Sequence, residues 1–182
     1  MLFRALGGIN ADFNLLLLGP AGERNIRNLK ILAEHNGFDA NKIICCGFQK
    51  DIAPFYKIID LTILPSSKEA LGLVLIESMA AGTPCIGTNS GGISEIITDG
   101  VDGFLFKQYD SNDLADKIRK IMENKTTRDA FILKGREKAK KMFPIEKTVK
   151  ETESVFYSLL RQKNASLSSN KHSAHQSLII LL

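Results

Sequence analysis

Short apolar runs alternate with amphipathic stretches along most of the chain, and the two patterns predict different elements. The apolar runs predict buried strands, at Leu15–Leu18, Lys42–Cys46, Asp60–Leu64, Cys85–Thr88 and Phe104–Phe106. The stretches between them have helical spacing, as at Glu23–His35, where Leu29 and Ala33 share a face. This alternation predicts an α/β fold, a Rossmann-like doubly wound parallel sheet with helices on both faces.

Helical patterns also occupy the two ends of the chain. Residues 2–9 have the character of a helix end, and three helices are predicted after Phe106, the last running from about Pro144 to Arg161. We therefore predict one domain over residues 1–162. Residues 163–182 are predicted to be a disordered tail, because most of them are polar and of low complexity.

The loops of unusual composition each follow a predicted strand. They are Gly19–Gly22, Gly47–Lys50, Pro65–Glu69 and Thr88–Gly92. In a doubly wound sheet, ligands bind beyond the carboxyl ends of the strands. The order of elements alone therefore predicts a ligand site formed by these loops.

The stretch Pro65–Gly92 holds the strongest candidates for chemistry. Glu69 precedes an apolar helix predicted from about Gly72 to Ala81, and Glu77 lies inside that helix. A helix N-terminus offers unpaired N–H groups and partial positive charge to phosphates, and carboxylates accept hydrogen bonds from hydroxyls. This combination suits a nucleotide sugar. The alternatives are a partly exposed helix residue for Glu77 and a favourable charge at a helix N-terminus for Glu69.

At these residues the chain resembles the C-terminal, donor-binding half of retaining glycosyltransferases with the GT-B fold, in the glycosyl transferases group 1 family. The likeness extends from about residue 2 to about residue 162. It is carried by four motifs in order, namely Glu69 with Glu77 eight positions later, Ala80–Pro84 (AAGTP), Gly91–Glu95 (GGISE) and Asp99–Leu105.

The resemblance implies a role for each matching residue. Glu69 would contact the transferred sugar, and Glu77 would bind the ribose hydroxyls of the donor nucleotide. Phe48–Lys50 lies where the family often places the nucleotide base. Six residues would bring backbone close to the sugar or the diphosphate: Ala70, Leu71, Gly72, Leu73, Gly91 and Gly92. The family usually has an aromatic residue where Leu71 stands, and a plain strand-to-helix turn is the alternative for the two glycines.

Two parts of the family pattern precede the matching region and are not in this sequence. They are an Arg and a Lys that contact the diphosphate, and the N-terminal acceptor-binding domain. In the sheet order 3-2-1-4-5-6, the absent segment would be the central strand, between Leu15–Leu18 and Asp60–Leu64. We therefore predict an N-terminally truncated donor domain that alone is poorly soluble or partly unfolded and transfers no sugar.

The predicted function is that of a glycosyltransferase, which transfers a sugar from a nucleotide-sugar donor to an acceptor with retention of configuration. The alternative is a catalytically incomplete nucleotide-sugar-binding module, or a partner subunit of a split enzyme. A dehydrogenase is disfavoured, because no Gly-x-Gly-x-x-Gly follows a strand. We expect no cofactor, with the donor as substrate, and no metal, because the sequence has no Asp-x-Asp motif or His/Cys cluster.

Composition narrows the partners and the compartment. Net charge is +4, with many positive residues between Lys117 and Lys150. Two interpretations stay open: contact with an anionic membrane surface or acidic partner, and a solvated helix face. We expect no nucleic-acid partner. The three cysteines lie in apolar runs and no clean signal peptide opens the chain, which together predict a cytoplasmic location.

Overall fold

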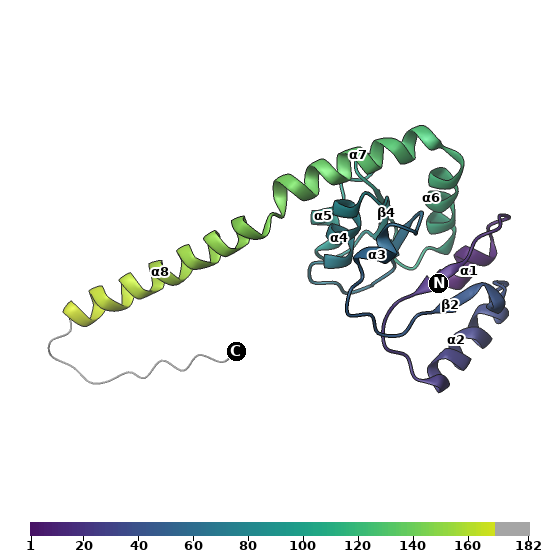
Figure 1. The fold of residues 1–182 in the computed structure, drawn as a ribbon, viewed down its shortest axis with the longest axis horizontal. Helices are drawn as coiled ribbons and strands as arrows, with labels where there is room; N and C mark the ends of the chain where they lie inside the picture. Colours follow the sequence, from purple (N-terminus) through teal and green to yellow (C-terminus); the bar gives the residue numbers. More distant parts are fainter. Residues whose placement is uncertain (170–182) are drawn as a thin grey trace. The chain divides into compact units, whose positions relative to one another are not determined.

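The computed structural model describes the backbone of residues 1–169 and the side chains of residues 1–163 (Figure 1). The described chain forms two compact units, Met1–Met142 and the residues from Phe143 onward. The second unit contains the helix α8 (Ile145–Ser169). The elements of the first unit, in chain order, are α1 (Leu2–Gly7), β1 (Leu15–Leu17), α2 (Glu23–His35), the 3-10 turn η1 (Ala40–Lys42), β2 (Ile43–Cys45), α3 (Ala53–Tyr56), β3 (Thr62–Leu64), α4 (Leu73–Ala81), β4 (Cys85–Thr88), α5 (Ile93–Ile96), β5 (Phe104–Phe106), α6 (Ser111–Glu123) and α7 (Lys125–Met142).

The strands of the first unit form two parallel groups. β1 pairs with β2, with Leu16 opposite Ile44, and β3, β4 and β5 pair in that order. Among the described residues, β1 and β3 each have a strand partner on one side only. In the predicted sheet order, the β1–β2 pair lies on one side of the absent central strand, and β3, β4 and β5 lie on the other side. The observed pairings agree with that order and with the predicted α/β fold class.

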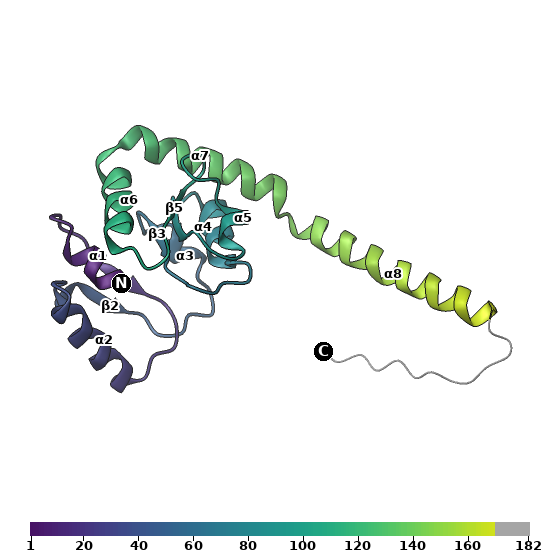
Figure 2. The same cartoon turned by 180° about the vertical axis from the view of Figure 1, so that it is seen from behind.

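One hydrophobic core joins the two strand groups. Helix α1 packs against α6, and Phe3 and Leu6 of α1 share a buried cluster with Ile86 of β4 and Phe106 of β5. The cluster also takes in Ile43 of β2. Figure 2 shows α1 and α2 beside β2, and α6 close to α1. The helix α1 therefore links the β1–β2 pair to the rest of the unit.

Helix α4 is held between the strands and α7. Leu75 is completely buried and Met79 is 2% exposed, and α7 packs along the same helix. Gly82 ends α4 with φ of +86°, a left-handed conformation that favours glycine. Arg136 of α7 donates a hydrogen bond from Nη2 to the carbonyl oxygen of Ala81 at 2.8 Å, which satisfies one of the last carbonyls of the helix. The C-terminal end of α4, a helix that begins at the predicted site, is thereby held in place.

Four expectations differ from the structure. The run Lys42–Cys46 was expected to be a buried strand, but Ile44 of β2 is 46% exposed, because β2 pairs with β1 alone. β1 was expected to be buried on both faces, but its three residues are all partly exposed, because it has a strand neighbour on one side only. Helix α4 was expected to be largely buried, but Leu73 is 62% exposed and Glu77 is exposed too. The last helix was expected to end near Arg161 and continues to Ser169, while the rest of the predicted tail, 170–182, lies outside the described residues. Within the described chain, no helix has the length and apolar character needed to cross a membrane.

Candidate functional site

Two loops that follow neighbouring strands meet at Glu69. The loop after β3 carries Glu69, and the loop after β4 carries Gly91 and Gly92. The backbone N–H of Gly92 donates a hydrogen bond to the carbonyl oxygen of Glu69 at 3.1 Å. Because β3 and β4 are parallel neighbours, their carboxyl ends place both loops at one edge of the sheet.

The two glycines are required by this contact. A Cβ on Gly91 would lie 2.5 Å from the carbonyl oxygen of Glu69, and a Cβ on Gly92 would lie 2.0 Å from that of Ala70. Gly91 also has φ of +53°, which disfavours a side chain. These glycines therefore shape the backbone around Glu69. Their predicted approach to a ligand stays a prediction.

The N-terminus of α4 begins directly after Glu69. Gly72 is its N-cap, with φ of +74° and no side-chain cap, so that no side chain satisfies the first N–H groups of the helix. A Cβ on Gly72 would lie 3.1 Å from Cδ2 of Leu64 and 3.4 Å from Cγ of Glu69. Ala70, Leu71 and Leu73 around this N-terminus are exposed. The structure thus brings Glu69, the residues 70–73 and the glycine pair together, and their roles in binding a ligand stay predictions.

Glu77 lies one helical turn after Leu73 on α4 and is exposed. Its Cα–Cβ bond is tilted toward the N-terminus of the helix, as in any α-helix. One of its carboxylate oxygens, Oε2, accepts a hydrogen bond from the hydroxyl of Tyr56 at 3.0 Å. Burial of Tyr56, followed by its hydrogen bond to the Glu77 carboxylate, raises the pKa of this phenol. Tyr56 therefore stays protonated and acts as a donor.

A buried polar network ties these elements together. The hydroxyl groups of Ser78 on α4 and Thr62 on β3 share a hydrogen bond, with 2.7 Å between Oγ and Oγ1. The Thr83 hydroxyl, just before β4, donates to the carbonyl oxygen of Tyr56 at 2.7 Å. The nearby thiol of Cys85 is completely buried, and burial raises its pKa to about 12. A thiol of this kind packs as an apolar group and does not act as a nucleophile at neutral pH.

Sequence reasoning missed three residues at this edge. Tyr56 gave no signal, because an aromatic residue in a short helix is ordinary core. Gln108 donates from Nε2 to the carbonyl oxygen of Ser67 at 2.9 Å, which joins the segment after β5 to the loop before Glu69. Ser90, beside Gly91, carries a buried hydroxyl oxygen for which the described residues provide no hydrogen-bond partner. A serine next to a glycine pair was the only available signal for it.

The remaining predictions concern the base-binding residue Phe48, the absence of a metal and the cysteines. Phe48 is 74% exposed, and the structure leaves its proposed place near a base as a prediction. Among the residues that the structure describes, no three His, Cys, Asp or Glu side chains are arranged to hold a metal ion. All three cysteines are free thiols.

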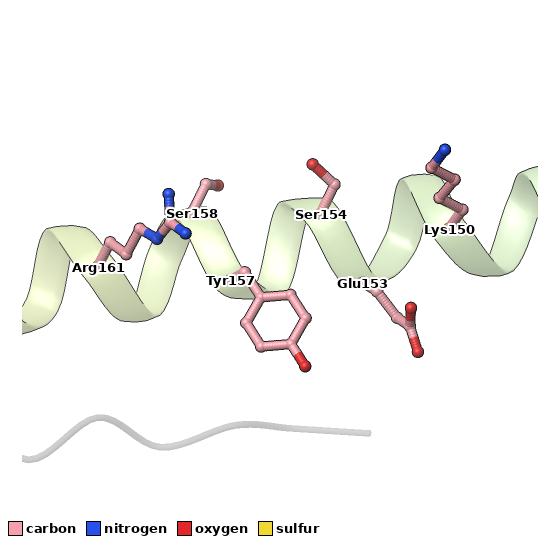
Figure 3. Close-up of a pocket in the computed structure, with 6 residues that line it drawn as sticks. All are labelled: Lys150, Glu153, Ser154, Tyr157, Ser158 and Arg161. Carbon is pink, nitrogen blue, oxygen red and sulfur yellow. The ribbon is translucent and has the colours of Figure 1, made fainter.

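A shallow pocket lies on the second unit, along α8. None of its lining residues was predicted for the site, and all belong to a single helix: Lys150, Glu153, Ser154, Tyr157, Ser158 and Arg161. Figure 3 shows Glu153 and Tyr157 pointing to one side of the helix and Lys150 and Ser154 to the other. These side chains do not converge on a common centre, and we assign no ligand to them.

The chain is similar to known proteins over most of its length. The family model for "Glycosyl transferases group 1" matches residues 2–138. The N-acetyl-alpha-D-glucosaminyl L-malate synthase of Bacillus anthracis is 34% identical over 155 residues, which are 82% of this chain and 39% of the relative.

Two solved structures share the fold over most of the chain. Anabaena Alr3699/HepE in complex with UDP-glucose aligns with a TM-score of 0.80 and 25% identity, over 86% of this chain and 44% of that one. The sucrose-phosphate synthase of Thermosynechococcus elongatus aligns with a TM-score of 0.80 and 26% identity, over 88% of this chain and 42% of that one. The chain thus spans about two fifths of the length of each of these three proteins.

Proposed function

Because the chain belongs to the glycosyl transferases group 1 family, we propose that it is the donor-binding part of a glycosyltransferase that transfers sugar from a nucleotide-sugar donor with retention of configuration. One observation carries the proposal. The loops after β3 and β4 meet at Glu69, directly before the uncapped N-terminus of α4.

This arrangement suits each part of a nucleotide-sugar donor. The N–H groups at the start of α4, with the positive end of the helix dipole, stabilise the negative charge that develops on the departing diphosphate. Glu69 accepts hydrogen bonds from hydroxyls of the transferred sugar. Glu77, further along α4, accepts them from the ribose hydroxyls. UDP-sugars are the first donors to try, since the Anabaena protein was solved with UDP-glucose.

The acceptor side of the reaction needs a further domain. The chain spans 39% of the malate synthase relative and 44% of the Anabaena protein. We propose that two further parts complete the enzyme: an N-terminal acceptor-binding domain, and an upstream strand and helix of the donor domain that supply the cationic groups that the diphosphate needs. That strand would pair between β1 and β3, which among the described residues have a strand partner on one side only. We further propose that no metal is required and that the protein is cytoplasmic, in keeping with three free thiols.

Calorimetry with UDP-glucose and with UDP tests the proposal, on the chain completed by the upstream strand and helix, and the variants described below are made in the same protein. We expect Glu77→Ala to weaken binding of both ligands by about 10- to 100-fold, because it removes charge-assisted hydrogen bonds worth roughly 1.5–3 kcal/mol. Glu69→Gln should weaken UDP-glucose binding and leave UDP binding nearly unchanged, because Glu69 contacts the sugar. The matched control is Glu123→Ala, an exposed glutamate at the end of α6.

Each outcome separates the candidate functions. Unchanged binding by a folded Glu77→Ala protein would contradict the assignment of the ribose site, and equal losses for both ligands in Glu69→Gln would contradict the division of roles. A binding module would bind the donor and form no transfer product when the acceptor domain is added, whereas a glycosyltransferase would form product. Product that still forms with EDTA present would support the proposal that no metal is required.

A further inference from the structure

The phenol of Tyr56 is the described side chain in hydrogen-bond contact with the Glu77 carboxylate. Tyr56 is the last residue of α3 and is only 6% exposed, and its hydroxyl lies 3.0 Å from Oε2 of Glu77. The same hydroxyl lies 3.2 Å from the carbonyl oxygen of Val74. The hydroxyl has one proton to donate. The carboxylate is the closer acceptor and is charged, so it forms the stronger of the two hydrogen bonds.

The position of Tyr56 is fixed independently of Glu77. Its carbonyl oxygen accepts the hydrogen bond of Thr83 at 2.7 Å, and Ser78 donates to the carbonyl oxygen of Thr83 at 3.1 Å. Ser78 and Thr83 are both buried. The end of α3 is thus joined to the end of α4 and the start of β4, and the phenol projects from a rigid base.

Glu77, which accepts the hydrogen bond of this phenol, belongs to a class of side chain that is mobile when unconstrained. An exposed glutamate on a helix samples several rotamers, and ordering it on ligand binding costs conformational entropy. A fixed hydrogen bond to Oε2 selects one rotamer before the ligand arrives and leaves Oε1 for the ligand. Preorganisation of this kind raises affinity by lowering the cost of ordering.

We propose that Tyr56 is a positioning residue for the donor site, which holds Glu77 in the rotamer that receives the ribose hydroxyls. The inference rests on the proposed role of Glu77 in donor binding. Tyr56 itself touches no reacting atom. Burial and the neighbouring carboxylate raise the pKa of the phenol, so Tyr56 remains a hydrogen-bond donor through the neutral range.

A purely structural role for the phenol predicts a different result. If the hydroxyl served only the carbonyl of Val74, its removal would lower stability and affect all variants alike. That carbonyl lies inside α4, where the helix supplies a backbone partner four residues on. Coupling between Tyr56 and Glu77 in ligand binding therefore distinguishes the two roles.

The test is a double-mutant cycle in UDP-glucose binding, measured by calorimetry on wild type, Tyr56→Phe, Glu77→Ala and the double variant. Phe keeps the buried ring and removes only the hydroxyl. We expect Tyr56→Phe to weaken binding by about tenfold in the wild-type background and by less than about twofold when Glu77 is already Ala. The matched control, Tyr157→Phe, alters an exposed tyrosine on α8 and should bind as wild type.

The outcomes are separable from those of the proposed function. Wild-type affinity or tighter binding in Tyr56→Phe, or an equal loss in both backgrounds, would overturn the positioning role while the donor site stands. A wild-type protein that binds no nucleotide sugar would overturn the proposed function and this inference together. Thermal melting of each variant identifies any loss that comes from unfolding.

Discussion

Replacing Gly92 with alanine should disturb the site by steric overlap alone, without backbone strain. Gly92 has φ of −64° and ψ of −15°, a conformation that alanine adopts without strain. An added methyl group would nevertheless lie 2.0 Å from the carbonyl oxygen of Ala70, 2.8 Å from its carbonyl carbon and 3.0 Å from Cα of Leu71. All three are backbone atoms, so no flexible side chain can move aside, and the loop that carries Glu69 must shift.

The size of the effect follows from that overlap. Relief of the contact requires the loop after β3 to move by about 1 Å, and overpacking of this kind costs about 1–3 kcal/mol of stability. For a domain of this length, the melting temperature should fall by roughly 3–10 °C. A displacement of about 1 Å at a binding loop can cost up to about 100-fold. We therefore expect Gly92→Ala to weaken UDP-glucose binding by about 10- to 100-fold.

The matched control is Gly8→Ala. Gly8 has a similar backbone conformation, with φ of −83° and ψ of 2°, and its added methyl group would meet only carbonyl oxygens at 3.5 and 3.6 Å, an ordinary contact. Thermal melting followed by calorimetry compares the two variants. If Gly92→Ala melts and binds like Gly8→Ala, the two loops do not constrain one another as described.

Two further predictions concern groups away from the donor loops. Lys138→Met leaves the buried carboxylate of Asp102 without its ion-pair partner at 2.9 Å and should lower the free energy of unfolding, measured with denaturant, by about 3–5 kcal/mol. The control Lys134→Met removes an exposed ion pair and should lower it by less than about 1 kcal/mol. Equal losses in the two variants would contradict this account. Burial raises the pKa of Cys85 to about 12 and keeps it a thiol. Iodoacetamide at pH 8 should therefore label the partly exposed Cys45 and spare Cys85 until the protein unfolds. Mass spectrometry measures the order of labelling, and labelling of Cys85 before Cys45 would contradict this prediction.

The sequence was most informative where a local signal decides the structure. The apolar run Cys85–Thr88 and the helix Glu23–His35 have the bounds that their patterns predict. Gly82 ends α4 as expected, because a left-handed residue after a helix favours glycine over other residues. The cluster around Glu69 was predictable because the carboxyl ends of parallel strands meet at one edge of the sheet.

Features that depend on distant parts of the chain could not be predicted in this way. The contact between Tyr56 and Glu77 joins residues 21 positions apart and results from the packing of α3 on α4. The glycine pair had two interpretations in the sequence, and only the structure shows that it packs on the backbone of Glu69 and Ala70. The partial exposure of β1 depends on which neighbours it has, and an apolar run carries no information about them.

The uneven burial of the two strand groups has a consequence for how the molecule opens. All four residues of β4 are buried, whereas those of β1 are partly exposed and α2 buries only Ala33. Regions with few buried apolar contacts open at lower free energy than the global transition, often as contiguous cooperative segments. Within the first unit, the β1–α2–β2 segment should therefore exchange its amide hydrogens before β3, α4 and β4. Leu73 and Glu77 of the proposed donor site lie on α4, in the slowly exchanging part, so transient opening of the first segment need not displace them.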